Sequence, residues 1–370
     1  MKYVKSLDSI RAIAVLLVIV THWFPKDLFI YSVAKAFNGV DVFFTLSGFL
    51  ITGILLQDRA EAEQFGQSRM QTFKNFFFRR VLRIFPIYYL TIFLIYLYNP
   101  SGEDIQFRYF LSFTSNFHYY AERSWGMLAH SWSLAVEEQF YLVWPWVVLF
   151  ISRKWLPYMM VLFIFSGIIT QQLLDPNEFS WILPMPCVDA LALGGLLGWI
   201  IYARPDSLEQ VYQSLRRIAM VALGFTLLRI AFHLSFPSTR TLTAFITLWA
   251  ICYCLVHDGQ RFHQYSLIFN NKFLIFLGRM SYGMYLFHFL IPYYTKDAFT
   301  WEYQHIVLPA SIKDHYGFYL AQNFVILIGV SWLSFHLIEQ PVLRLKKYFR
   351  NRPAAQPGLP GTAEPVTVSG

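Results

Sequence analysis

The sequence contains few charged residues. Only 14% of its 370 residues are Asp, Glu, Lys or Arg, whereas 56% are hydrophobic. A soluble domain typically has about 25% charged residues, so this chain has too little charge to cover a water-facing surface. The scarcity of charge excludes a water-soluble Rossmann or barrel enzyme, and the apolar content excludes a disordered chain. The composition indicates a protein that lies in the lipid bilayer.

Cysteine is also scarce. Cys187, Cys252 and Cys254 all lie in apolar stretches, and the last two are only two positions apart. This spacing offers neither a disulfide framework nor the paired ligands of a zinc site. We therefore expect no structural metal and no secreted disulfide scaffold.

Long apolar stretches recur from one end of the chain to the other and predict an all-α polytopic membrane protein with about ten transmembrane helices. The apolar segment 106–118 is short and lies between polar residues, so we expect a re-entrant or interfacial helix there. No small-residue cleavage site follows the first stretch, which we interpret as a retained span and not as a signal peptide. The expected spans are 9–24, 38–57, 84–98, 131–152, 155–173, 187–203, 217–235, 240–257, 273–294 and 316–339.

Lys and Arg are concentrated in the segments between spans that lie on the same side of the membrane as the N-terminus. An excess of Lys and Arg marks the cytoplasmic loops, so both termini are expected to be cytoplasmic. Residues 1–342 are expected to form one transmembrane domain. Residues 343–370, basic at first and then rich in Pro and Gly, are expected to form a disordered cytoplasmic tail.

Two ionisable residues share one face of the first expected span. Arg11 and His22 are eleven residues apart, which is three helical turns plus about 20° and roughly 16 Å along the axis. The structural alternative for Arg11 is a side chain that reaches the cytoplasmic headgroups, and for His22 a ring bonded to a neighbouring helix. Because ionisable residues within a span mark functional sites by default, His22 is a candidate catalytic residue.

Three arginines precede the third span. Arg79, Arg80 and Arg83 lie three and four residues apart, among aromatic residues and next to Pro86, so they are expected to share one helical face. Guanidinium groups are planar, bidentate donors that suit phosphate groups. The structural alternative is ordinary flanking charge on the cytoplasmic side.

The fourth span contains two adjacent carboxylates. Ser133, Glu137 and Tyr141 fall on one face at i, i+4 and i+8, and Glu138 lies about 100° away. A carboxylate in hydrocarbon must meet a partner or line a wet cavity. We expect Glu137 to face a cavity and Glu138 to pair with an arginine such as Arg229; the structural alternative is that both carboxylates brace the bundle.

Weaker signals come from three further places. Asp41 begins the second span at a depth comparable with that of His22 and could orient that imidazole. Ser281 and Tyr282 open a polar patch that runs to His288, and Glu339 ends the last span, where it could neutralise an arginine. Structural bracing is the stronger interpretation for these three places.

Taken in order, these residues resemble the acyltransferase-3 family of polytopic membrane proteins, which transfer acyl groups to extracytoplasmic sugars. The resemblance extends from Leu7 to Pro341. Each block is weak alone, but the ordered series is specific. The blocks are the Arg11–His22 pair, Gly39-Val40-Asp41-Val42-Phe43-Phe44-Thr45-Leu46-Ser47-Gly48, Arg79-Arg80 with Arg83, Trp132-Ser133-Leu134 with Glu137-Glu138-Gln139-Phe140-Tyr141, Ser281-Tyr282 with Tyr285 and His288, and Glu339-Gln340-Pro341.

The resemblance implies a donor and its binding residues. Cytoplasmic acyl-CoA, most commonly acetyl-CoA, would be a donor substrate and not a permanently bound cofactor. Its phosphates would be bound by Arg79, Arg80, Arg83 and Arg11. The pantetheine arm is comparable in length with the Arg11–His22 separation and would present the thioester near His22.

The resemblance also implies the chemistry at the other end of the first span. His22 would act as general base on a sugar hydroxyl or as a transient acyl carrier, with Glu137 or Asp41 orienting it. Ser133, Ser281 and Tyr282 are candidate donors to the oxyanion, and with Glu138 they make up the candidate substrate-binding residues. The acceptor would be lipopolysaccharide O-antigen or exopolysaccharide at the bacterial inner membrane, with envelope-polysaccharide assembly proteins as further partners.

Two features depart from the family pattern. The family commonly has Gly after the first-span Arg, where this chain has Ala12. Many bacterial members also carry a C-terminal SGNH hydrolase-like domain, whereas this chain is expected to be of the stand-alone type. The alternative functions are a transporter or flippase of lipid-linked sugars, an O-acyltransferase for a small molecule, and a non-catalytic scaffold. A transporter would show broken helices repeated in two matching halves, and the sequence has no obvious repeat.

Overall fold

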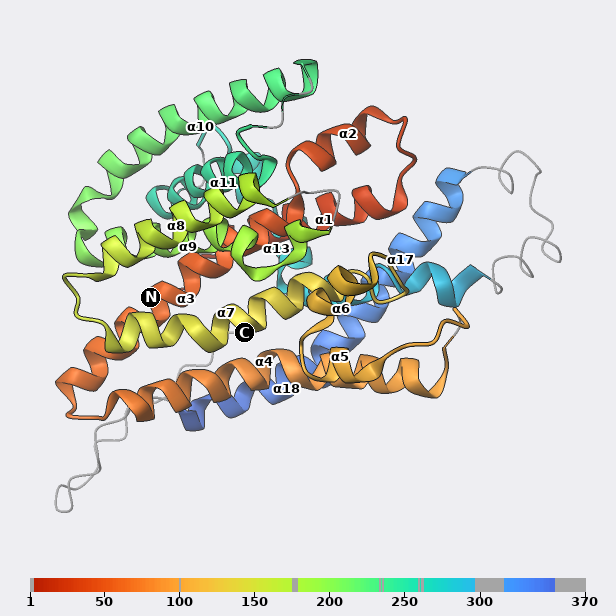
Figure 1. Ribbon diagram of the computed structural model, residues 1–370, viewed down its shortest axis with the longest axis horizontal. Coiled ribbons are helices and arrows are strands. Elements are labelled where there is room, and N and C mark those ends of the chain that lie inside the picture. Colours follow the sequence, from red (N-terminus) through yellow and green to blue (C-terminus); the bar gives the residue numbers. More distant parts are fainter. Residues whose placement is uncertain are drawn as a thin grey trace.

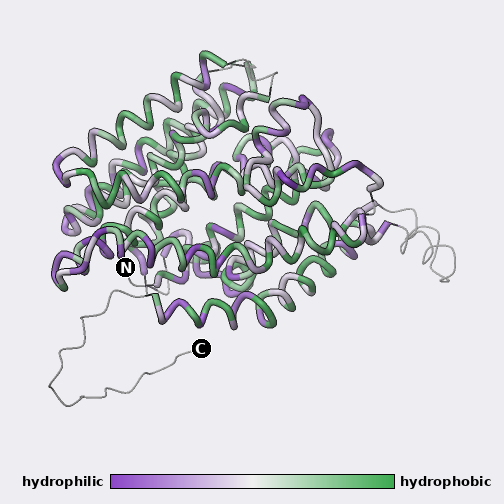
Figure 2. The backbone as a smooth tube through the Cα atoms, turned by 60° about the horizontal axis from the view of Figure 1, so that its bottom comes forward, coloured by the Kyte–Doolittle hydropathy of each residue, from purple (hydrophilic) through white to green (hydrophobic). Residues whose placement is uncertain are grey.

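The helices lie side by side, with the long ones roughly along the longest axis of the molecule (Figure 1). The computed structural model describes residues 3–99, 101–174, 179–232, 234, 236–258, 260, 263–296 and 316–349. Within these residues every regular element is a helix and there is no strand, in agreement with the expected fold class. The long helices are hydrophobic over most of their length (Figure 2).

The elements follow one another along the chain without large insertions. They are α1 (Ser6–Trp23), α2 (Phe29–Ala36), α3 (Gly39–Gln64), α4 (Arg69–Leu97), α5 (Phe107–Leu111), α6 (Ser115–Glu122), α7 (Ser131–Phe150), α8 (Leu156–Leu173), the 3-10 helix η2 (Ser180–Ile182), α9 (Pro184–Ala203), the 3-10 helix η3 (Pro205–Ser207), α10 (Leu208–Phe232), α11 (Thr239–Val256), α12 (Ser266–Phe269), α13 (Lys272–Arg279), α14 (Ser281–Phe287), α17 (Tyr316–Ser334), the π-helix η4 (Phe335–Glu339), α18 (Gln340–Leu343) and the 3-10 helix η5 (Arg344–Phe349).

Among the residues described, seven helical stretches are long and apolar enough to cross a membrane. Helices α7 and α10 lie where spans were expected but are not among these seven stretches. The ninth expected span, 273–294, is interrupted between α13 and α14. The chain therefore has the helices of a multi-pass membrane protein, while the count of ten and the cytoplasmic termini remain predictions. The stretches are Ser6–Trp23, Phe29–Gln64, Arg69–Leu97, Leu156–Leu173, Pro184–Ala203, Thr239–Val256 and Tyr316–Phe349.

Segment 106–118 does not form one continuous helix. It is divided between α5, of five residues, and α6, of eight, with Phe113 in a left-handed backbone conformation between them (φ 52°). Neither helix is long enough to cross a bilayer, because a span needs about 20 residues. An eleventh span at this position is therefore excluded.

Helix α3 lies at the centre of the bundle and packs closely against α9. A Cβ at Gly48 of α3 would lie 1.8 Å from the carbonyl oxygen of Leu191, and one at Gly194 of α9 would lie 1.9 Å from that of Thr45. Small residues at such crossings let two membrane helices approach until their backbones touch. The α3–α9 contact depends on these glycines.

Helix α1 is the other central element, and the broken helix α13–α14 runs beside it in the same direction. Near its start, Ser9 donates to the carbonyl oxygen of Phe269 at 2.8 Å. At its end, the Trp23 indole donates to the carbonyl oxygen of His288 at 2.8 Å. Phe269 lies in α12, just before α13, so the two ends of α1 are fixed to the two ends of the segment that runs from α12 to α14.

The expected start of the disordered tail is wrong. Residues 344–349 form η5 and pack against α4, where Arg79 donates to the carbonyl oxygen of Phe349 at 2.6 Å and Phe78 stacks on the Phe349 ring at 5.1 Å. The basic stretch is ordered because α4 offers it both an aromatic face and a hydrogen-bond donor. Residues 350–370, which the tail prediction also covers, lie outside the described residues.

Candidate active site

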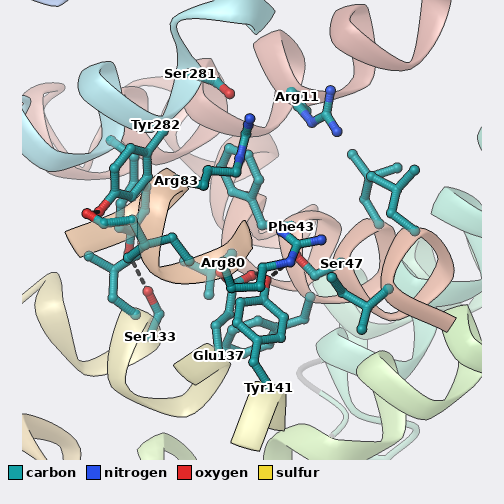
Figure 3. Close-up of a pocket in the computed structure, with 18 residues that line it drawn as sticks. Arg11, Phe43, Ser47, Arg80, Arg83, Ser133, Glu137, Tyr141, Ser281 and Tyr282 are labelled. Atoms are coloured by element: carbon teal, nitrogen blue, oxygen red, sulfur yellow. Dashed lines mark hydrogen bonds between the residues drawn. The ribbon is translucent and has the colours of Figure 1, made fainter. Parts of the chain in front are cut away.

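A cavity between α1, α3, α4, α7 and α14 brings together residues that are far apart in the sequence (Figure 3). Its free volume is about 100 Å³, which is room for a few water molecules. Seven of the predicted site residues line it: Arg11, Arg80, Arg83, Ser133, Glu137, Ser281 and Tyr282. The face of α7 predicted from the i, i+4, i+8 spacing is the face that lines the cavity, since Tyr141 is also in its wall.

Glu137 is held by hydroxyl groups on one side of the cavity. Its Oε1 accepts from the Ser47 hydroxyl at 2.9 Å, and Ser47 in turn accepts from the Tyr141 hydroxyl at 3.1 Å. The Arg80 guanidinium lies over the Tyr141 ring, 5.1 Å from its centroid (Figure 3). Arg80 is therefore stabilised by an aromatic face and by the nearby carboxylate.

Arg83 is the cavity arginine without a close partner. In the described part of the chain its guanidinium makes no hydrogen bond and no ion pair within 4 Å, and it lies beside Tyr282 (Figure 3). Arg11 is already paired with Asp8 one helical turn earlier. Lys346 of η5 also lies near Arg83. The site therefore carries excess positive charge and can bind an anion.

Arg79 does not line this cavity. Its guanidinium forms an ion pair with Asp58 of α3 and a hydrogen bond to the tail at Phe349. Arg79 and Arg83 share a helical face, as expected, but the ion pair with Asp58 holds the Arg79 guanidinium away from the cavity. Lys346 was missed in the sequence because it lies in the stretch assigned to the disordered tail.

Asp41 lies in a different cluster from the one expected. Its Oδ1 accepts from Arg240 Nε at 2.7 Å, with both side chains buried. Arg240 also donates to the carbonyl oxygens of Pro186 and Trp181, at 2.6 and 3.2 Å. The structure thus pairs Asp41 with Arg240 and not with His22, and the pair joins α3, α9 and α11.

The pairing of Glu138 with Arg229 is wrong. Arg229 donates to the carbonyl oxygen of Pro237 and to Thr239 Oγ1, at 3.4 Å for the latter. Glu138 instead lines an apolar groove on another side of α7, together with Phe113 and other aromatic residues. Its Oε1 is buried and has no hydrogen-bond partner among the described residues.

His22 does not line the arginine cavity but is connected to it through α14. Tyr285 lines the cavity, and its backbone oxygen contacts His288 Nδ1 at 2.6 Å. His288 Nε2 in turn lies 3.1 Å from His22 Nδ1. The partner of His22 is therefore a histidine 266 residues away in the sequence. It is neither of the two carboxylates that the sequence suggested, Glu137 and Asp41.

A third histidine, His130, completes this cluster at the start of α7. Its ring lies 5.4 Å from that of His288 between centroids, and it is buried near the carbonyl of Leu286 without a well-formed hydrogen bond. No group of three or more His, Cys, Asp or Glu among the residues described is arranged to hold a metal ion. The sequence signal for His288 was the polar patch that begins at Ser281; His130 gave no signal beyond its place before the fourth span.

A second pocket lies in the α4–α7 connection, at the end of the bundle where α1 ends and α7 begins. Its volume is about 590 Å³. It combines aromatic residues such as Tyr109 and Trp125 with the acidic residues Glu103, Asp104 and Glu122. Aromatic rings and carboxylates together suit a neutral polar ligand with many hydroxyl groups.

The helical bundle defines a polytopic membrane protein with an internal polar cavity that is lined by arginines. The chain belongs to the acyltransferase-3 family, whose model, described as an acyltransferase domain, matches residues 4–335. No solved structure matches the chain.

Curated relatives of this chain are named as acetyltransferases. The peptidoglycan O-acetyltransferase OatA of Listeria monocytogenes is 37% identical over 172 residues, 42% of this chain and 25% of the relative. The O-acetyltransferase OatA of Staphylococcus aureus is 26% identical over 331 residues, 81% of this chain and 52% of the relative. The chain thus spans about half or less of the length of these relatives.

Proposed function

We propose that this protein is an integral membrane O-acyltransferase that moves an acetyl group from cytoplasmic acetyl-CoA to a hydroxyl of an extracytoplasmic sugar. The main support is the relation between the two ends of α1. Arg11 lies in the arginine cavity near one end, and His22 lies at the other. One helix therefore joins an anion-binding site to a candidate general base.

The donor's phosphates occupy the arginine cavity in this proposal. Arg83 is available because it has no close partner in the described part of the chain, and Arg80 and Arg11 add charge beside it. The cavity is too narrow for the pantetheine arm as it stands, at about 100 Å³. Donor binding therefore requires the side chains along α1 and α14 to move apart.

The chemical step takes place at His22. The imidazole removes the proton of the sugar hydroxyl, whose oxygen attacks the thioester carbonyl carbon; the C–S bond then breaks, and the leaving CoA thiolate receives the proton. A transient acyl-histidine is the alternative route. The oxyanion donors predicted from the sequence, Ser133, Ser281 and Tyr282, line the arginine cavity, so this cavity must open as far as His22 for them to take that role. Tyr282 donates to the Ile84 carbonyl oxygen at 3.0 Å, and the hydroxyl groups of Ser133 and Tyr285 lie 2.6 Å apart.

The acceptor approaches from the pocket in the α4–α7 connection, on the same end of the bundle as His22. Its aromatic and acidic lining suits a carbohydrate better than an anion. A relative's name specifies peptidoglycan, whereas the sequence led us to expect O-antigen or exopolysaccharide. All are bacterial envelope carbohydrates, which makes the cytoplasmic membrane the proposed location and envelope-polysaccharide assembly proteins the proposed partners.

Measuring acetyl esters in the bacterial envelope tests this proposal. Peptidoglycan, lipopolysaccharide and exopolysaccharide are isolated from host cells with and without the gene, and ester-linked acetate is measured in each. Loss of acetate from one of them at unchanged yield supports the transferase and identifies the acceptor. Unchanged acetate in all three contradicts sugar acetylation, and loss of the polysaccharide itself indicates a transporter.

A further inference from the structure

The Nδ1 atom of His22 has two polar partners within hydrogen-bonding distance. This nitrogen lies 2.9 Å from the carbonyl oxygen of Val18, one turn earlier on α1, and 3.1 Å from His288 Nε2. The two imidazole rings are tilted by 45° with 5.0 Å between centroids. His22 Nε2 makes no hydrogen bond to any described residue, and the side chain is exposed.

The protons on both rings follow from their partners. A carbonyl oxygen only accepts hydrogen bonds, so His22 Nδ1, facing Val18, carries a proton. The same argument applies to His288 Nδ1, which lies 2.6 Å from the carbonyl oxygen of Tyr285. His288 Nε2 is then an acceptor for the His22 Nδ1 proton, and the lone pair of neutral His22 is on Nε2.

His288 is itself held firmly. It is fully buried, and its carbonyl oxygen accepts from the Trp23 indole at 2.8 Å. The adjacent Tyr285 hydroxyl donates to the carbonyl oxygen of His130 at 3.0 Å, which links this part of α14 to α7. The acceptor nitrogen therefore has a fixed position relative to the end of α1.

We propose that His288 is a positioning residue that holds His22 with Nδ1 protonated and Nε2 free to accept the proton of the acceptor hydroxyl. This inference rests on the proposed role of His22 as general base. When Nε2 takes the hydroxyl proton, the positive charge of the ring is stabilised by the Nδ1–H to His288 Nε2 hydrogen bond, and the proton is later passed to the CoA thiolate. His288 thus has the place that a carboxylate has in a Ser-His-Asp triad, without contacting the substrate.

The test uses the full-length protein in membrane vesicles from its host, with radiolabelled acetyl-CoA and the vesicles' own glycan. His288→Leu removes the acceptor atom at similar volume, whereas the side-chain oxygen of His288→Gln can still accept from His22. His130→Leu is the matched control, because it removes a buried histidine of the same cluster that makes no well-formed hydrogen bond. Membrane abundance is measured for every variant.

We expect His288→Leu to lower the maximal rate about 10- to 100-fold, the range of a hydrogen bond to a charged group, with the KM for acetyl-CoA unchanged. His288→Gln should recover much of that rate, and His130→Leu should lose less than His288→Leu. A wild-type rate in His288→Leu, or equal losses in all three variants, overturns the positioning role. A wild-type rate in His22→Ala would instead overturn the proposed function on which it rests.

A second measurement does not depend on any His288 variant. Nitrogen-15 spectra of histidine-labelled protein distinguish protonated from unprotonated ring nitrogens, and the difference between wild type and His22→Gln identifies the His22 signals. We expect a protonated Nδ1 and an unprotonated Nε2 for the neutral ring. The reverse assignment overturns the proposal.

Discussion

Asp41 of α3 and Arg240 of α11 form a buried ion pair, with 2.7 Å between Oδ1 and Nε. Arg240 extends the contact to α9 through the carbonyl oxygens of Pro186 and, just before that helix, Trp181. Three helices are thereby joined by one guanidinium. The pair accounts for an acidic residue at the start of a membrane helix without giving it a part in the chemistry.

Removing one partner of this pair should destabilise the protein. Asp41→Asn leaves Arg240 buried without its counter-charge, so we expect a loss of about 3 to 5 kcal/mol in the free energy of unfolding. Replacing both residues by apolar ones, Asp41→Leu with Arg240→Met, should restore a large part of it. Thermal unfolding in detergent measures both. An Asp41→Asn variant that is as stable as wild type but inactive would contradict the structural role.

The α3–α9 contact should not tolerate a single added methyl group. Gly194→Ala would place Cβ 1.9 Å from the Thr45 carbonyl oxygen, so the helices must separate at a cost of about 1 to 3 kcal/mol. Gly224→Ala on α10 is the matched control, because nothing lies within 4 Å of the added atom. A lower melting temperature is expected for the first variant only, and equal melting temperatures would contradict the close packing.

Arg83 should matter more than Arg79 for binding the donor. Arg83→Ala removes the cavity arginine without a close partner, and we expect the KM for acetyl-CoA to rise about 10- to 100-fold. Arg79 is already engaged by Asp58 and Phe349, so Arg79→Ala should raise that KM much less. Initial rates over a range of acetyl-CoA concentrations in vesicles measure the difference. Equal effects would place the phosphates outside the cavity.

A substitution in the pocket of the α4–α7 connection should weaken binding of the acceptor and leave binding of the donor unchanged. Trp125 is 43% exposed there and is held between Tyr119 and Phe179, with centroids at 5.4 and 4.7 Å. Trp125→Ala is expected to raise the KM for added fragments of the host's envelope glycan about 3- to 10-fold, with the KM for acetyl-CoA unchanged. The exposed Trp155 before α8 provides the control variant Trp155→Ala. An unchanged acceptor KM in Trp125→Ala would exclude this pocket as the acceptor's approach.

Residues that share a helical face were predictable from spacing. The register that places Ser133 and Glu137 together follows from the helical repeat alone, and the cavity confirms it. The all-helical fold class likewise followed from the length of the apolar stretches.

Contacts between helices far apart in the sequence were not predictable in this way. The Asp41–Arg240 pair joins positions 199 residues apart, and the His22–His288 contact joins positions 266 apart. Helical spacing gives the face of a helix but not the helix that covers it, so Glu137 and Asp41 both stayed open as partners for His22. The helical structure of residues 344–349 was missed for the same reason. Their positive charge indicated a solvent-exposed, disordered segment, and the contact with α4 that stabilises them is not visible in the sequence.

Acetyl transfer with His22 as the general base is tested by comparing wild type with His22→Ala in vesicles given radiolabelled acetyl-CoA. Alkali-labile label in the glycan is counted at equal membrane abundance of the two proteins. Loss of a general base lowers a rate about 10²- to 10⁴-fold, so we predict at least a 100-fold smaller rate in the variant. A His22→Ala rate within a few-fold of wild type would contradict the proposed mechanism.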